Sequence, residues 1–127
     1  MYDVELVAEL LNQILVAAHR IERRFEPIRT ANDFLSSDEG IDHLDGIAMM
    51  LIVIGESVKN LDKVTNGTLL PRFPEVDWKG AKGAKGVRDV ISHHYMDLNA
   101  EVIFDICQTF VPSLIATVEE MQREIAA

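Results

Sequence analysis

Apolar residues at helical spacing recur in three long stretches of the chain, and this pattern constrains the fold more than any other sequence feature. In residues 3–25 the apolar positions repeat at i, i+3, i+4 and i+7, which is the spacing of one helix face. They are Val4, Val7, Leu10, Leu11, Ile14, Ala17, Ala18, Ile21 and Phe25. Pro27 follows shortly afterwards, so we predict that this first helix ends near residue 25.

A second long helix is predicted to begin near Ser37, Asp38 and Glu39, which supply a capping hydroxyl and N-terminal acids. One short helical turn around residues 34–35 is expected before it. Its main apolar stripe is Ile41, Leu44, Ile47, Ala48, Leu51, Ile54, Val58 and Leu61, and Met49, Met50, Ile52 and Val53 extend the apolar surface nearly all round. Such a helix usually has more than one packing partner, so we expect a central helix or one that also meets a second subunit.

Residues 62–77 are predicted to form a loop, because Asn66-Gly67 is a turn signal and prolines follow at 71 and 74. Asp77 is a candidate cap for a short helix starting at Trp78, and a third helix is expected over residues 87–95. Asn99 is the expected N-cap of a last helix that runs to about residue 125. Pro112 lies inside this helix and is expected to kink it, because proline removes one backbone donor.

No segment alternates with period two, so the predicted fold is all-α, a four- to five-helix bundle in one domain over residues 1–127. No uninterrupted apolar run approaches the roughly 20 residues of a membrane span, and no basic stretch followed by an apolar one opens the chain. Cys107 is the single cysteine, which excludes a disulfide framework and a cysteine zinc site. These features lead us to expect a cytoplasmic protein without a membrane partner.

The charge of the chain is unevenly distributed. The net charge is −9, which argues against a protein that coats nucleic acid. Residues 79–88, however, contain Lys79, Lys82, Lys85 and Arg88 and no acid, which leaves −9 − 4 = −13 on the rest. These cations form either a positive ridge or an ordinary solvated face. Glycines at 80, 83 and 86 each cost a helix about 1 kcal/mol relative to alanine, so this stretch is expected to be irregular.

The segment after this stretch combines groups that can move protons and bind phosphate. On a helix with 100° per residue, Arg88 and Tyr95 share one side, and Asp89 and His93 are i, i+4 neighbours. A hydrogen bond from Asp89 can orient the His93 ring and favour its charged form. His94 falls within the apolar stripe of the same helix, where a core histidine is expected.

These groups suit cleavage of RNA without a metal ion. The ribose 2′-hydroxyl is an internal nucleophile that needs a base, an acid for the leaving oxygen and positive charge near the phosphorane, which His93 and Arg88 can supply. Two histidines are natural for this reaction, and a two-fold dimer with the site in its interface provides both. From the residues alone a second interpretation stays open, with a surface Arg88–Asp89 pair, a partly buried His93 and an aromatic core or rim residue at Tyr95.

The residues also match a known family. Arg88-x4-His93-x-Tyr95 resembles the Arg-x4-His-x-Tyr motif of the HepT-type HEPN toxins, and Ile54-Gly55-Glu56 resembles an Ile-Gly-Glu segment of their central helix. Residues 74–78, Asp97 and the Pro112-x-Leu114 pair add to a similarity that covers roughly residues 3–125. The chain departs from the family in the distance from Trp78 to Arg88, which is longer here by about one Ala-Lys-Gly triplet.

The resemblance implies a dimerising helical bundle with endoribonuclease activity and Arg88 and His93 as catalytic residues. It implies a toxin–antitoxin pair whose antitoxin is a minimal nucleotidyltransferase of the MntA type, with Tyr95 as the AMP acceptor. Asp89 and Glu56 are expected to support the site, and no cofactor is expected. The alternative function is a non-catalytic nucleotide-binding or scaffold partner of such a transferase, and a plain structural dimer is a third possibility.

A metal site is not expected. His43 with Asp42 and Asp45 has ordinary helix-surface spacing, and the adjacent His93 and His94 point to different helix faces.

Overall fold

The computed structural model describes residues 2–78, 86 and 99–126, and these residues form helices and connecting loops without a strand. The predicted all-α fold is therefore confirmed for this part of the chain. Its elements are α1 (Val4–Phe25), the 3-10 helix η1 (Ala31–Phe34), α2 (Asp38–Val64), the 3-10 helix η2 (Leu70–Arg72), α4 (Ala100–Asp105), the π-helical turn η4 (Ile106–Phe110) and α5 (Val111–Ala126). The predicted third helix over residues 87–95 lies outside the described residues, and so does the predicted short helix beyond its first residue, Trp78.

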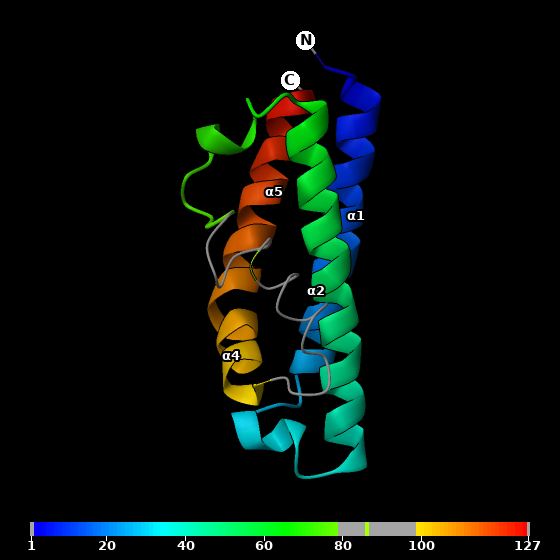
Figure 1. Cartoon of the computed structure of the whole chain (residues 1–127), viewed down its shortest axis with the longest axis vertical. Coiled ribbons are helices and arrows are strands. Elements are labelled where there is room, and N and C mark those ends of the chain that lie inside the picture. Colours follow the sequence, from blue (N-terminus) through cyan, green and yellow to red (C-terminus); the bar gives the residue numbers. More distant parts are fainter. Residues whose placement is uncertain (1, 79–85, 87–98, 127) are drawn as a thin grey trace.

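Three long helical segments pack side by side along their lengths (Figure 1). α1 and α2 run antiparallel and make the most extensive contact, and α5 also packs on α1. Because α4 and α5 run parallel to α2, both chain termini lie at the same end of the bundle. The core fills the space between these helices.

α1 begins and ends close to its predicted limits. The carboxylate of Asp3 accepts a hydrogen bond from the Leu6 backbone N–H at 3.2 Å, which caps the first turn. Most of the predicted stripe is buried: Val7, Leu10, Leu11, Ile14, Ala17, Ala18 and Ile21. The prediction was wrong for Val4, which is 52% exposed because it lies in the first turn, at the end of the bundle.

α2 begins at the predicted cap. The Ser37 hydroxyl accepts a hydrogen bond from the Gly40 N–H at 3.0 Å. A Cβ atom at Gly40 would lie 2.1 Å from the Asp33 carbonyl oxygen, so only glycine lets η1 pack this closely on the helix start. Apart from Ile41, which is 40% exposed contrary to expectation, the predicted main stripe of α2 is buried.

An aromatic cluster closes the end of the bundle opposite the termini. Phe34 of η1, the predicted short turn, is fully buried, and its ring stacks on Phe25 of α1 with centroids 6.4 Å apart. Phe25 also meets Phe104 of α4 edge-on, with centroids 5.1 Å apart. The three rings join the ends of three elements, and such pairs add about 0.5–1.5 kcal/mol each beyond the area they bury.

The connection after α2 is partly more regular than predicted. α2 continues to Val64 and is closed by Asn66 and Gly67, which adopt positive φ angles of 53° and 71°. The Gly67 N–H donates to the Asp62 carbonyl at 2.8 Å, so the Asn-Gly signal ends a helix here. The following loop contains η2, where Pro71 occupies one of the first helical positions and needs no N–H donor.

The last helix begins at the predicted cap and is interrupted where proline was expected to disturb it. The Asn99 side-chain oxygen accepts hydrogen bonds from the N–H groups of Glu101 and Val102 at 2.9 and 3.2 Å. The π-helical turn η4 lies directly before Val111-Pro112. Pro112 lacks an N–H group and its ring would clash with the carbonyl four residues earlier, so a wider turn relieves both constraints.

Among the described residues one helical stretch, Ala100–Ala126, is long and apolar enough by composition to cross a membrane. Core helices pass the same test, and the buried residues of this stretch pack into the bundle against α1. We therefore interpret its apolar character as that of a core helix.

Candidate functional site

The residues of the predicted catalytic motif, Arg88, Asp89, His93 and Tyr95, lie outside the described residues. The structure describes the chain on both sides of them. On the N-terminal side it describes the loop that ends at Trp78, and on the C-terminal side it describes the cap of α4 at Asn99. These two anchors fix the described chain on either side of the motif.

The N-terminal anchor is a buried tryptophan. Trp78 is only 7% exposed, and its indole N–H donates to the Phe73 carbonyl at 2.9 Å. Phe73 and Val76, which precede it, are also buried. The loop is therefore packed onto the bundle up to the residue before the basic stretch, although its prolines and turn signal predicted only an irregular connection.

Glu56, the predicted supporting residue, lies on the exposed face of α2 between two buried neighbours, Gly55 and Ser57. The Ile-Gly-Glu segment thus turns its isoleucine and glycine into the bundle and its carboxylate outward. Whether Glu56 approaches the motif stays a prediction, because the other partners fall outside the described residues.

The single thiol is unsuited to nucleophilic chemistry. Cys107 is buried in the π-helical turn, and burial raises its pKa to about 12. A thiol with such a pKa holds almost no thiolate at neutral pH, and thiolate is the reactive form.

In the described part of the chain, no group of three or more His, Cys, Asp or Glu side chains is arranged to hold a metal ion. His43 approaches one carboxylate, that of Glu39, with 3.6 Å between Nε2 and Oε1. Asp42 and Asp45 are exposed on the same helix. His43 thus takes part in an i, i+4 contact within α2 rather than in a ligand cluster.

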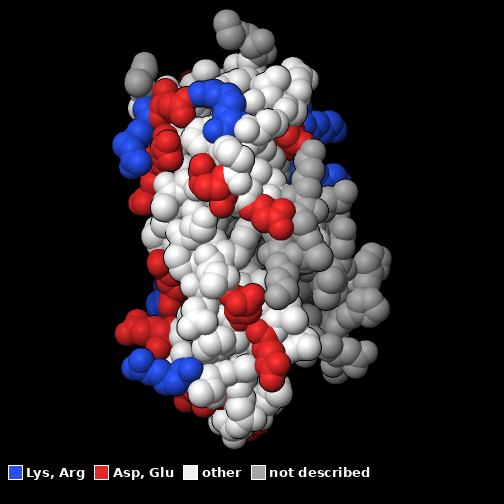
Figure 2. Space-filling view, turned by 90° about the vertical axis from the view of Figure 1, so that its left-hand side faces the viewer, with Lys and Arg blue, Asp and Glu red and all other residues white. Residues whose placement is uncertain are grey.

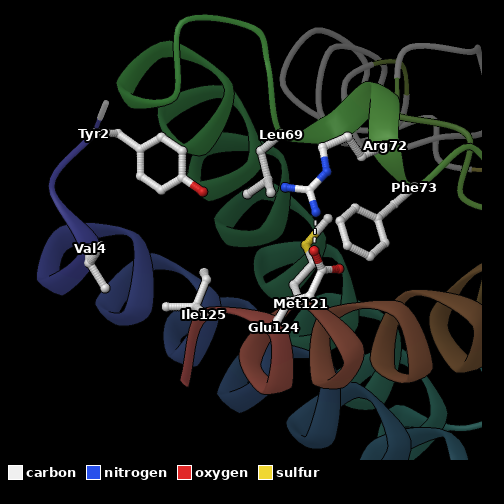
Figure 3. Close-up of a pocket in the computed structure, with 8 residues that line it drawn as sticks. All are labelled: Tyr2, Val4, Leu69, Arg72, Phe73, Met121, Glu124 and Ile125. Atoms are coloured by element: carbon white, nitrogen blue, oxygen red, sulfur yellow. Dashed lines mark hydrogen bonds and ion pairs between the residues drawn. The ribbon is translucent and has the colours of Figure 1, made fainter. Parts of the chain in front are cut away.

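A pocket that the sequence did not predict lies at the end of the bundle where both termini are found (Figure 3). It has a volume of about 220 Å³ and lies between the start of α1, the η2 loop and the end of α5. Arg72 reaches across it to form an ion pair with Glu124, 52 residues away, and its guanidinium lies 5.8 Å from the Phe73 ring centroid. Because no local pattern links residues so far apart, no sequence signal could have identified this pair.

The charges of the described surface disfavour RNA on one side of the molecule. Figure 2 shows the side on which α4 and α5 lie, where acidic side chains occur along the whole length and most basic ones lie near the edges. Glu75, Asp77 and Asp105 line a cavity of about 250 Å³ beside η4. Such a surface repels phosphates. Residues 79–88, with four cations and no acid, therefore offer RNA phosphates more positive charge than this face does.

Comparison with known proteins places the chain in a family. The family model described as ribonuclease HepT-like matches residues 14–121, a range that includes the Arg88-x4-His93-x-Tyr95 motif. A curated protein of Methanocaldococcus jannaschii, described as "Putative RNase MJ0127", is 40% identical over 75 residues. That alignment covers 59% of this chain and 56% of the relative. No solved structure matches the chain. The match over most of its length shows that the chain belongs to the HepT-like ribonuclease family.

Proposed function

We propose that the protein is the toxin of a toxin–antitoxin pair and a metal-independent endoribonuclease acting in the cytoplasm. Its site is composed of Arg88 and His93 from two subunits. The observation that carries this proposal is the ribonuclease HepT-like match over residues 14–121, within which both residues of the Arg-x4-His motif are present. The relative described as an RNase supports RNA as the substrate class.

The chemistry follows from the groups of the motif. An imidazole of His93 takes the proton of a ribose 2′-hydroxyl, and the 2′-oxygen attacks the adjacent phosphorus. The bond from phosphorus to the 5′-oxygen then breaks, and a second imidazole gives that oxygen a proton. The Arg88 guanidinium stabilises the additional negative charge of the phosphorane. The products are a 2′,3′-cyclic phosphate and a 5′-hydroxyl, and no metal-bound water is required.

Because the reaction uses one imidazole as base and another as acid, we expect a homodimer. Each chain carries one motif, whereas base and acid are two imidazoles, so two chains related by a two-fold axis complete the site. The outer face of α2 supports such a dimer. On this face Met49 is 55% exposed and Ile41 is 40% exposed. Ile52 and Val53, which lie between Met49 and Glu56 in the sequence, are half-buried. An exposed apolar face on α2 suits a second copy.

The proposed regulator is an MntA-type nucleotidyltransferase antitoxin that adds AMP to Tyr95. AMP on this tyrosine would introduce a bulky anion beside Arg88 and His93, where the RNA phosphate must lie. After co-expression with the transferase, the intact mass should rise by whole AMP units in the wild type and stay constant in Tyr95→Phe. An unchanged wild-type mass would remove this part of the proposal.

The test of the activity is RNA cleavage in the presence of EDTA. Arg88→Ala and His93→Ala should each lose about 100-fold or more in rate, since one general acid or base contributes about 10²–10⁴. His19→Ala and Arg123→Ala are matched controls, because both side chains are exposed on other helices and His19 pairs with Glu22. They should cleave like the wild type.

Two results would decide against the proposal. Equal cleavage by all four variants would show that the site assignment is wrong. Intact RNA together with nucleotide binding by the purified wild type would favour the alternative, a non-catalytic nucleotide-binding or scaffold partner of a minimal nucleotidyltransferase.

A further inference from the structure

Half of the lysines and arginines that the structure describes lie in residues 20–29, at the end of the bundle opposite the termini (Figure 1). Three of them, Arg20, Arg23 and Arg24, belong to the last two turns of α1. On a helix with 100° per residue they lie within about 100° of one another, so they share one side of α1, which we call the arginine face. Arg20 and Arg23 are exposed, and Arg24 is half-buried.

The arginine face is not neutralised by neighbouring acids. In the part of the chain that the structure describes, no ion pair joins these three guanidinium groups to a carboxylate. Glu22, the acid between them in the sequence, contacts His19 instead, with 2.7 Å between Oε1 and Nδ1. Residues 19–29 contain four arginines and two glutamates, so this segment is positive in a chain whose net charge is −9.

The position at the end of α1 explains only part of this charge. The carbonyl end of a helix attracts cations, but the attraction falls off within the last turn. It accounts for Arg23 and Arg24, which belong to that turn, and not for Arg20 one turn earlier. Arg24 also lies against α2, where a Cβ atom at Gly46 would be 2.4 Å from its Nε. The missing side chain at Gly46 thus makes room for an arginine that has no acidic partner.

The end of α1 that carries the arginine face packs on the first described helix after the catalytic motif. Phe25, the last residue of α1, meets Phe104 of α4 edge-on with ring centroids 5.1 Å apart. The cap of α4, Asn99, follows His93 by six positions in the sequence. The arginine face therefore lies at the end of the bundle at which the described chain resumes after the motif.

We propose that the arginine face binds the phosphate backbone of RNA outside the cleavage site, an inference that rests on the proposed endoribonuclease function. Arginine suits this task, because its planar guanidinium donates two parallel hydrogen bonds to one phosphate. Contacts to phosphates carry no sequence information, so the face positions the RNA and does not select bases. The substrate class that follows is RNA long enough to extend from the cleaved linkage to the end of α1, rather than a dinucleotide.

The first test measures binding without cleavage. The probe is a fluorescein-labelled single-stranded RNA of about 20 nucleotides, longer than most single-strand binding sites, in which every 2′-hydroxyl is methylated. Arg20→Gln/Arg23→Gln in the full-length protein should weaken its binding about tenfold in fluorescence anisotropy. The slope of log affinity against log salt concentration should become shallower by about 1.4, since each lost phosphate contact contributes about 0.7 on a single strand.

Lys59→Gln/Lys63→Gln is the matched control. Both lysines are exposed in the last two turns of α2, at the opposite end of the bundle, and their replacement changes the net charge by the same amount. This variant should bind the RNA like the wild type and with the same salt dependence. Arg20→Lys/Arg23→Lys keeps both charges and should recover most of the binding, and circular dichroism would confirm that each variant is folded.

Cleavage of substrates of two lengths separates positioning from structural damage. With an unmodified RNA of the same length, Arg20→Gln/Arg23→Gln should raise KM about tenfold at an unchanged kcat, because it removes binding that is equal in the ground state and the transition state. A dinucleotide does not reach the arginine face, so the variant should cleave it at the wild-type rate. A merely structural effect would lower both rates.

Two results would overturn the inference. The first is equal RNA affinity and equal salt dependence in the folded arginine and lysine double variants. The second is an Arg20→Gln/Arg23→Gln variant that sediments as a monomer where the wild type is a dimer, which would assign the arginine face to a second copy of the chain. RNA that binds through the arginines and stays intact in the wild type would support this inference and contradict the proposed cleavage.

Discussion

Two glycines of α2 show how close packing at single residues shapes this bundle. A Cβ atom at Gly40 would lie 2.1 Å from a backbone oxygen, that of Asp33. At Gly46 it would lie 2.4 Å from Nε of Arg24, which is the far part of a flexible side chain. The first neighbour cannot move without displacing η1, whereas the second can adopt another rotamer.

Gly40→Ala should therefore destabilise the protein by about 1–3 kcal/mol, the usual range for overpacking, and Gly46→Ala by clearly less. Urea unfolding of both variants measures the difference. Equal stability of the two would contradict the account of η1 packing on the start of α2.

Asp33 links stability to pH. Backbone hydrogen bonds from the N–H groups of Arg29 and Thr30, at 2.8 and 3.0 Å, lower the pKa of this carboxyl from 3.8. A lowered folded-state pKa means that the stabilisation is complete above the unfolded pKa and is lost as pH falls through the folded pKa. The unfolding temperature of the wild type should therefore fall as the pH is lowered below 3.8, the ordinary pKa of this group.

Asp33→Asn should reduce that loss, because the ionisation is absent. Thermal unfolding of both proteins at neutral and acidic pH measures it, with Asp42→Asn as the exposed control. A wild type and an Asp33→Asn variant with the same pH dependence would show that the turn contributes no linked protonation.

At the scale of elements, the capping residues predicted where helices begin more reliably than the apolar pattern predicted which residues are buried. Ser37 and Asn99 were predicted caps and act as caps, because capping needs only a side chain and amides two or three residues away. Val4 and Ile41 were predicted to be buried and are exposed, because periodicity identifies a helix face and does not say where its neighbour ends. Pro112 predicted an irregularity, and only the structure identifies it as a π-helical turn.

The outer face of α2 gives a prediction about assembly. Met49→Glu places a charge in the centre of the proposed dimer face, so the variant should sediment as a monomer under conditions in which the wild type is a dimer. Val16→Glu, an exposed apolar residue of α1 with 43% exposure, is the matched control and should remain dimeric. A dimeric Met49→Glu variant would exclude this face as the interface.

For the whole molecule, the helical bundle could be predicted from patterns within each helix, and the site only from its motif. Arg88, His93 and Tyr95 were assigned by spacing and resemblance, and the structure contributes the anchors at Trp78 and Asn99 on either side. Contacts between distant segments, such as Arg72 with Glu124, had no sequence signal. Membership in the HepT-like ribonuclease family joins these parts into one account.

The ends of the RNA products test the central claim most directly. With EDTA present, the wild type should yield 2′,3′-cyclic phosphate and 5′-hydroxyl ends, identified by mass spectrometry of a defined oligonucleotide, and a substrate with 2′-deoxyribose throughout should stay intact. Products with 5′-phosphate ends, or cleavage that EDTA abolishes and a divalent metal restores, would contradict a reaction driven by the arginine and histidine of two subunits.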